Sequence, residues 1–297
     1  MSKLRLEEIL RQKDQLSRRQ RVLCKYIIEN ANEADMLTAK QLAAAAGVGD
    51  ATVFRFLKEY GYASYAEFRA ELHKYVVEFT RSSYWQMKAS LQSETGPKKG
   101  HVLYQAFSSS IDLIEKSMTS KLAGQFDDAV DAMLSASEVG LLGLRSSKAV
   151  ALYFHAILMP FFPKTKQFSY DEHFIFEQIK SMSEGSVLFV ISSWPNTKMT
   201  VQAAEYCHNL GHKIILLTNS FLCPITAYAD LLLIVPEARE RYTIVPYISI
   251  LEALAREIGK RLAPESIYKL EEMDEILALQ QVTNWEDRKK ALSPEKF

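Results

Sequence analysis

Residues 38–62 decide the fold of the first part of the chain and read TAKQLAAAAGVGDATVFRFLKEYGY. A helix is expected from about residue 39 to residue 46, opened by a capping box in which Thr38 and Gln41 satisfy each other's backbone amides. Gly47 suits the left-handed position that ends a helix, and Gly49 suits the N-cap of the next one. The next helix then places apolar side chains on one face at helical spacing, namely Val53, Phe56, Leu57 and Tyr60. Two short helices joined by a tight glycine turn are typical of a helix-turn-helix unit.

The outward face of the second helix would read DNA if this unit binds in the major groove. Thr52 and Arg55 are neighbours there, and an arginine can bind guanine or a phosphate. Lys58 is better placed for a phosphate. Asp50 suits the amides of its own helix, because a carboxylate near phosphates is repelled. A plain helical hairpin is the alternative that spacing alone permits. The candidate DNA-binding residues are Lys40, Gly49, Asp50, Thr52, Arg55 and Lys58.

Two more capping boxes predict helix starts nearby, at Ser17 with Gln20 and at Ser64 with Glu67. Apolar residues at helical spacing also occur in residues 3–13. Residues 1–80 are therefore expected to form an all-helical, helix-turn-helix DNA-binding domain.

Charge is unevenly distributed along the 297 residues, although the net charge is zero. Residues 1–25 hold eight basic and three acidic side chains, whereas residues 101–297 hold 19 basic and 24 acidic ones. A basic front on an acidic body indicates a polyanionic partner, with a solvated charged face as the alternative. At roughly 150 residues per domain, the length predicts two domains.

Several classes of protein are disfavoured by composition. The three cysteines lie far apart in the sequence, so no disulfide framework or CxxC site is available, and this usage suits a reducing cytosol. No apolar run approaches the roughly 18 residues that a membrane span needs. The first residues lack the apolar core of a signal peptide. We expect a cytoplasmic protein without membrane association.

The chain changes character after a Ser-, Gly-, Pro- and Lys-containing stretch at residues 81–100, which is predicted to be a linker. Short continuous apolar runs follow, at residues 138–144, 186–191, 213–217 and 231–235, with a weaker one at 166–170. Such runs are typical of strands covered on both faces. Helices are expected at residues 102–118, 119–135, 148–159, 172–182, 197–209, 240–262 and 264–280. This alternation predicts a doubly wound, mainly parallel α/β domain over residues 101–265, followed by a C-terminal helix and tail over 266–297.

No GxGxxG, P-loop, HExxH or CxxC motif is present, and no cofactor or metal site is expected. In open α/β sheets, ligands bind outside the carboxyl ends of strands, near helix N-termini. Two Ser-containing loops fit that place, a first effector loop at residues 143–147 and a second at residues 192–197, and their residues suit anionic oxygens. Ser147 and Thr197 serving only as N-caps is an equally open alternative. The candidate effector-binding residues are Arg145, Ser146, Ser147, Ser192, Ser193 and Thr197.

The first 80 residues resemble the helix-turn-helix domain of RpiR/MurR-family bacterial regulators, through residues 37–69, LTAKQLAAAAGVGDATVFRFLKEYGYASYAEFR. The rest resembles the sugar isomerase (SIS) domain that this family joins to it, down to Ala229-Asp230 before the last strand. The resemblance implies that the front domain binds double-stranded operator DNA as a homodimer or homotetramer. It also implies that the SIS domain senses a phosphosugar and that the protein is not an enzyme.

This sequence departs from the family pattern at both effector loops. The common first loop is Gly-x-Gly-x-Ser; Gly143 and Ser147 match, but Arg145 replaces the second Gly. The common second loop is Ser-x-Ser-Gly-x-Thr. Ser192 and Thr197 match, but Trp194-Pro195 replaces the inner Ser-Gly pair, and proline removes an amide that could face a phosphate. Arg145 either compensates as an anion partner or bridges to an acidic neighbour.

The sequence thus predicts a bacterial transcriptional regulator that binds operator DNA and senses a small anionic metabolite, a phosphosugar by resemblance. One alternative is a sugar-phosphate isomerase, for which Glu237, Glu240 and His173 are the candidate bases. The other is a regulator whose SIS domain only mediates dimerisation.

Overall fold

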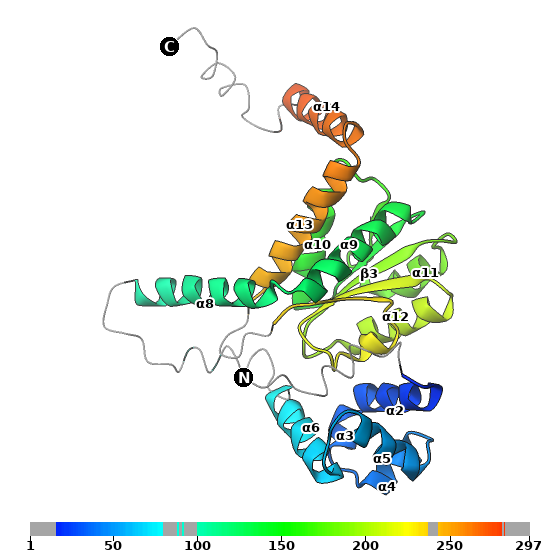
Figure 1. Ribbon diagram of the computed structural model, residues 1–297. Coiled ribbons are helices and arrows are strands. Elements are labelled where there is room, and N and C mark those ends of the chain that lie inside the picture. The colour runs from blue at the N-terminus through cyan, green and yellow to red at the C-terminus, as the bar shows by residue number, and fades with distance from the viewer. Residues whose placement is uncertain are drawn as a thin grey trace.

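The computed structural model describes residues 16–79, 100–236 and 243–280, together with Lys88, Leu91 and Val282. The predicted linker at 81–100 and the tail after 282 lie largely outside these residues. The first part is helical, as predicted (Figure 1). Its helices are α2 (Arg18–Glu29), α3 (Ala31–Ala34), α4 (Ala39–Ala45), α5 (Asp50–Glu59) and α6 (Tyr65–Phe79).

Two of the three predicted capping boxes are confirmed. The Ser17 and Thr38 side chains accept from the amides of Gln20 and Gln41, whose own side chains accept from the cap amides in return. The third box is wrong in one partner. Glu67 donates its amide to Ser64 Oγ at 3.1 Å, but its carboxylate accepts from the amide of the residue before Ser64, at 2.7 Å. All three boxes still begin helices where the sequence places them.

A compact apolar core unites these helices. Leu23 of α2, Leu42 of α4, Phe56 of α5 and Phe68 of α6 are fully or almost fully buried in one cluster. Burying one such side chain stabilises the fold by about 1.5–3 kcal/mol. The core therefore fixes the orientation of α5 against α2 and α4.

The second part contains a five-stranded, all-parallel sheet in the order β2-β1-β3-β4-β5, as the doubly wound prediction requires. Its strands are β1 (Val139–Leu142), β2 (Thr165–Gln167), β3 (Val187–Ser192), β4 (Lys213–Thr218) and β5 (Leu231–Ile234). Its helices are α8 (His101–Ser117), α9 (Ser120–Ser135), α10 (Ser146–Leu158), α11 (Ile175–Lys180), α12 (Lys198–Asn209), α13 (Val245–Arg261) and α14 (Glu265–Leu279), with short 3₁₀ helices η2 (Glu172–Phe174) and η3 (Pro224–Ala227).

Helices cover both faces of the sheet (Figure 1). One face packs against α9, α10 and α13, through residues such as Phe154 and Leu254. The other packs against α11 and α12, through residues such as Ile179 and Ala204. The central strands β1 and β3 are buried throughout, which explains their unbroken apolar sequence.

Four predicted elements differ from the structure. The weak strand expected at 166–170 is instead Thr165–Gln167, an edge strand of three residues with alternating burial. The helix expected at 172–182 is divided between η2 and α11, and α10 begins two residues before the predicted position 148. The segment at 237–242, where the helix expected at 240–262 would begin, lies outside the described residues, and α13 begins at Val245.

The helical part packs on the carboxyl edge of the sheet through α2 and η3 (Figure 1). Phe221 and Leu222, which follow β4, join the core cluster of the helical part. The ammonium of Lys25 lies 4.9 Å from the centroid of the Tyr228 ring, a cation–π contact. On α5, the face that carries Arg55 and Lys58 takes no part in this docking and is exposed to solvent.

Candidate DNA-binding and effector-binding sites

The turn between α4 and α5 has the geometry that the glycines predict. Gly47 adopts a φ of +66°, a conformation that a β-carbon disfavours. Its amide donates to the Ala44 carbonyl at 3.1 Å, and the Val48 amide donates to the Ala43 carbonyl at 2.9 Å. Gly49 then occupies the N-cap of α5 in an extended conformation. The two helices are thus held in a helix-turn-helix arrangement.

The two faces of α5 differ as the sequence predicts. Val53, Phe56 and Leu57 are buried in the domain core. The opposite face is exposed, with Thr52 half-buried and Arg55 and Lys58 open to solvent. Lys40 of α4 and both Gly49 and Asp50 at the start of α5 are exposed on the same unit. The candidate DNA-binding residues therefore lie at accessible positions on the two helices and their turn.

The charges on this face are available to a ligand. Neither Arg55 nor Lys58 forms an ion pair with any residue that the structure describes. The nearby acid Glu59 is engaged elsewhere, because its Oε2 accepts a hydrogen bond from Gln20 Nε2 at 2.6 Å. The Asp50 carboxylate forms no hydrogen bond within the described part of the chain, so the predicted capping bond is absent and only the helix dipole favours its position.

Phe54 falls on the outward face of α5 by its sequence spacing, but it is absent from the candidate DNA-binding residues. Its ring is 54% exposed on the outward face of α5, beside Arg55. An exposed aromatic ring is costly to leave in water, and on a recognition helix it can contact a thymine methyl group. Its outward position between two buried positions, Val53 and Phe56, makes it a further candidate for DNA contact.

The first effector loop joins β1 to α10 and is closely packed at Gly143. A β-carbon on Gly143 would lie 2.6 Å from the Ser147 carbonyl oxygen, so glycine is required there. The Gly143 amide donates to Ser169 Oγ at 2.9 Å. Ser147 is 5% exposed and lies in the first turn of α10. The N-cap is Arg145, so the alternative role of Ser147 as the N-cap is wrong.

Arg145, in the first effector loop, has an unusual backbone conformation. Its φ of +54° and ψ of −123° place it in a region that glycine adopts readily and other residues avoid. The side chain is exposed and forms no ion pair with the residues described here. The bridge to an acidic neighbour considered from the sequence is therefore absent in the described part of the chain, and the guanidinium stays available to an anion.

The second effector loop joins β3 to α12 and is held by internal hydrogen bonds. Ser192 Oγ accepts from Asn196 Nδ2 at 2.8 Å, and Ser193 Oγ donates to Tyr247 Oη at 3.0 Å. The Trp194 amide donates to Asn219 Oδ1 at 3.1 Å. Thr197 lies at the N-cap of α12, but its side chain makes no capping bond. Asn196, Asn219 and Tyr247 position this loop, and sequence spacing gave no signal for them.

The two loops meet at the carboxyl ends of neighbouring strands, because β1 pairs with β3. The chain leaves β1 towards β2 and leaves β3 towards β4, in opposite directions along the sheet. This is the topological switch point, where open α/β sheets bind ligands. The sheet therefore brings the predicted effector residues to one edge, with Arg145 and Ser146 exposed and Ser147 and Ser192 buried.

The remaining candidates for chemistry do not form a catalytic group in the described residues. His173 is exposed on η2, and Glu237 and Glu240 lie outside those residues. No cluster of three metal-ligating side chains occurs in the part of the chain that the structure describes. Cys207 and Cys223 are buried, and burial raises the pKa of Cys207 to about 12 and that of Cys223 to about 11. Such thiols stay protonated and serve as packing groups.

Comparisons with solved structures support this architecture. The chain is similar to the Vibrio vulnificus NanR protein complexed with ManNAc-6P, at 21% identity and a TM-score of 0.55, over 93% of this chain and 98% of that one. It is also similar to the sugar isomerase domain of an RpiR transcription factor from Sphaerobacter thermophilus. That match has 21% identity and a TM-score of 0.55, over 59% of this chain and 98% of that one. At these identities the likeness establishes the fold.

Sequence comparisons identify both parts. The HTH-type transcriptional regulator HexR of Escherichia coli is 25% identical over 255 residues, which cover 84% of this chain and 83% of HexR. HexR of Pseudomonas aeruginosa is 24% identical over 247 residues, with 82% and 83% covered. None of the described helices has the length and apolarity of a transmembrane span. Residues 3–78 match the helix-turn-helix domain of the rpiR family, and residues 132–256 match the SIS domain. The chain therefore belongs to the RpiR family of transcriptional regulators, which join a helix-turn-helix domain to a SIS domain.

Proposed function

We propose that the protein binds double-stranded operator DNA by inserting α5 into the major groove. The main support for this proposal is the exposed face of α5, where Arg55 and Lys58 form no ion pair with a described residue. The neighbouring acid Glu59 is held by a hydrogen bond from Gln20. Arg55 and Thr52 read base edges, and Lys58 and Lys40 bind phosphates. The N-terminus of α5, at Gly49 and Asp50, presents its free backbone amides to the phosphates of the DNA.

The effector in this proposal is a small anionic metabolite, a phosphosugar, bound at the switch point. Arg145 supplies the positive charge, and Ser146, Ser147, Ser193 and Thr197 supply hydroxyl groups around it. The similar NanR protein was solved with ManNAc-6P, which supports this ligand class. Trp194-Pro195 stands where the family pattern has a Ser-Gly pair, and the proline offers no backbone amide to a phosphate, so we expect Arg145 to make the main contact with the anion.

A homodimer, or a homotetramer built from it, completes the proposal. An apolar stripe runs along α8 and its C-cap residue at helical spacing, and each member is more than half exposed: Leu103, Tyr104, Phe107, Ile111 and Met118. Exposed apolar stripes of this kind mark protein–protein contacts. In Figure 1, α8 projects from the sheet as an arm that a second copy can cover. Two paired copies would present two α5 helices to half-sites about one DNA turn apart.

The mechanism follows from this pairing. Effector binding changes the separation of the two α5 helices, and a small change weakens or strengthens simultaneous binding of both half-sites. The protein acts as a regulator without catalysis in this proposal. Deuterium exchange at C2 of sugar phosphates, followed by NMR, tests that point, and measurable exchange would favour the isomerase alternative.

The DNA test is fluorescence anisotropy with duplex DNA from upstream of the protein's own gene, beside a scrambled duplex of equal length. We expect tight, salt-sensitive binding to the native duplex only. The double variant Thr52→Ala with Arg55→Ala should abolish this specific binding and keep the circular dichroism spectrum. Unchanged affinity in that variant would contradict the assignment of these residues.

The effector and the dimer have separate tests. A thermal-shift screen of sugar phosphates should give a reproducible hit that is lost in Ser147→Ala. A ligand at 100 times its Kd raises the free energy of unfolding by roughly 2.7 kcal/mol, which is enough to detect. No hit would favour a SIS domain that only dimerises. Light scattering should show a smaller particle for Phe107→Glu, whereas Val102→Glu, exposed on α8 but off the stripe, should leave the mass unchanged.

A further inference from the structure

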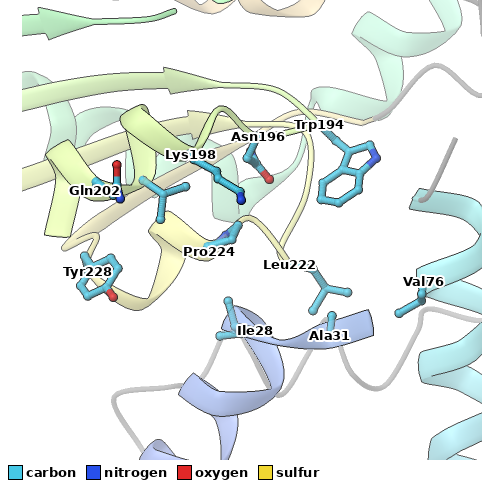
Figure 2. A pocket seen from close by; sticks show the side chains of 11 residues that line it. Ile28, Ala31, Val76, Trp194, Asn196, Lys198, Gln202, Leu222, Pro224 and Tyr228 are labelled. Atoms are coloured by element: carbon cyan, nitrogen blue, oxygen red, sulfur yellow. The ribbon is translucent and has the colours of Figure 1, made fainter. Parts of the chain in front are cut away.

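A pocket of about 420 Å³ lies between the helix-turn-helix part and the SIS domain (Figure 2). Its lower wall comes from Ile28 of α2, Ala31 of α3 and Val76 of α6. Its upper wall comes from the segment after β3 and from the start of α12, where Asn196 and Lys198 point towards the helical part. The volume lies within the range of about 300–1,000 Å³ that is typical of small-molecule sites.

This pocket is centred one strand away from the switch point and shares only the second effector loop with it, through Trp194 and Asn196. The proposed effector edge lies between the loops that follow β1 and β3, whereas the pocket lies between the segments that follow β3 and β4, with Leu222 contributed by the latter. No residue of the first effector loop, 143–147, is among those that line it. The pocket therefore offers a second place for a ligand, one strand farther along the sheet.

The side chains that line the pocket indicate which class of ligand would bind there. Most of the wall is apolar, and Trp194 provides a broad ring surface. Lys198 is the one cation among the described lining residues, it forms no ion pair with a described residue, and no described acidic side chain lines the pocket. An apolar body with a single anionic group fits this arrangement.

Asn196 gives an independent indication of a ligand. Its Nδ2 donates to Ser192 Oγ at 2.8 Å and to Cys223 Sγ at 3.2 Å. Its Oδ1 is buried and accepts no hydrogen bond from any residue described here. A buried acceptor without a partner is unfavourable, so a donor is expected to approach it. A hydroxyl or N–H group on the ligand would satisfy it.

We propose that this interdomain pocket binds an organic anion with an apolar body, a carboxylate or a phosphate ester, and that this ligand fixes the helix-turn-helix part against the SIS domain. Lys198 binds the anionic group, Trp194 packs on the apolar body, and Ile28 and Ala31 close the site. Because both domains line the pocket, the ligand binds only when they are docked and shifts the population towards that arrangement. The effect on DNA rests on the proposed function, whereas binding itself does not.

The probe is 8-anilinonaphthalene-1-sulfonate, an aromatic anion whose fluorescence rises on binding, titrated into the full-length protein. Ala31→Phe fills the pocket, and Ala123→Phe places the same ring at an exposed position of α9 as its control. Lys198→Met removes the cation. Lys213→Met is the matched control, because Lys213 is exposed at the amino end of β4, away from the carboxyl ends of the strands where the pocket lies. Circular dichroism verifies that every variant is folded.

We expect one saturable site per chain that is lost in Ala31→Phe, is about tenfold weaker in Lys198→Met, and is unchanged in both controls. Identical titrations for the wild type and both pocket variants would overturn the site. Loss in Ala31→Phe alone would overturn the anionic ligand class. In a second arm, the probe should change operator affinity at least threefold in the wild type and leave Ala31→Phe unaffected. Pocket binding with unchanged operator affinity would overturn the coupling, whereas a wild type that binds no operator with or without the probe would contradict the proposed function instead.

Discussion

Gln20 and Glu59 link α2 to α5 through a hydrogen bond of 2.6 Å from Nε2 to Oε2. Gln20 is buried, and its Oε1 also accepts from the Ser17 amide in the capping box of α2. One side chain therefore caps one helix and holds the end of another. The acid that would repel a phosphate is held by the same contact.

Replacing Gln20 tests this double role. We expect Gln20→Ala to lower the free energy of unfolding by about 1–3 kcal/mol, because it removes a cap bond and a hydrogen bond to a charged group. Urea unfolding followed by circular dichroism measures this loss. Gln105→Ala, at an exposed position of α8, should stay within about 0.5 kcal/mol of the wild type. Equal stability of the two variants would show that the contact contributes nothing.

The two basic residues on α5 should differ in how they contribute to DNA binding. Arg55→Ala should cost about 1–3 kcal/mol on the native operator and reduce the preference over scrambled DNA. Lys58→Ala should weaken both duplexes alike and lower the slope of log affinity against log salt by about 1. Anisotropy at several salt concentrations separates the two. A salt slope unchanged by Lys58→Ala would remove it from the phosphate contacts.

Arg145 joins a backbone cost to an expected ligand contact. Arg145→Gly should raise the free energy of unfolding by about 1 kcal/mol, because glycine adopts a φ of +54° without strain. Arg145→Ala keeps the strain and should give no such gain. Both variants lack the guanidinium and should lose the thermal shift caused by a sugar phosphate. Retention of that shift in either variant would show that Arg145 is no anion partner.

Gly143 and Gly124 form a matched pair of glycines. Gly143→Ala places a β-carbon 2.6 Å from the Ser147 carbonyl oxygen and should destabilise the protein by about 3 kcal/mol. Gly124 lies inside α9 with no atom within 4 Å of a β-carbon position, so Gly124→Ala should stabilise it by about 0.5–1 kcal/mol. Thermal or urea unfolding gives the sign of each change. Equal effects at the two positions would contradict the geometry of the first loop.

Local sequence was informative where local interactions decide the structure. The Thr38 box, the left-handed Gly47 and the apolar face of α5 depend on residues within one or two turns, and the structure has all of them. The buried strands β1 and β3 were predictable because cover on both faces leaves an unbroken apolar run. The short edge strand at Thr165–Gln167 has no such run, and its position was predicted less well.

Long-range contacts explain what the sequence did not predict. Ser193 pairs with Tyr247 and Trp194 pairs with Asn219, and no spacing along the chain indicates either contact. The packing of α2 on η3 joins residues about 200 positions apart, and it creates the pocket beneath Asn196. Phe221 and Leu222 are ordinary apolar residues by sequence, yet they belong to the core cluster of the helical part.

The docking of the helical part through α2, with α5 facing away, has a consequence for genetics. Within the helical part, substitutions that abolish operator recognition should map to α5, whereas substitutions that uncouple it from the SIS domain should map to the opposite side of the same small domain. Ile28 and Leu222 face each other across that second side. Spontaneous mutants whose substitutions fall in the helical part, sorted by phenotype, would thus separate into two groups on opposite faces of that domain.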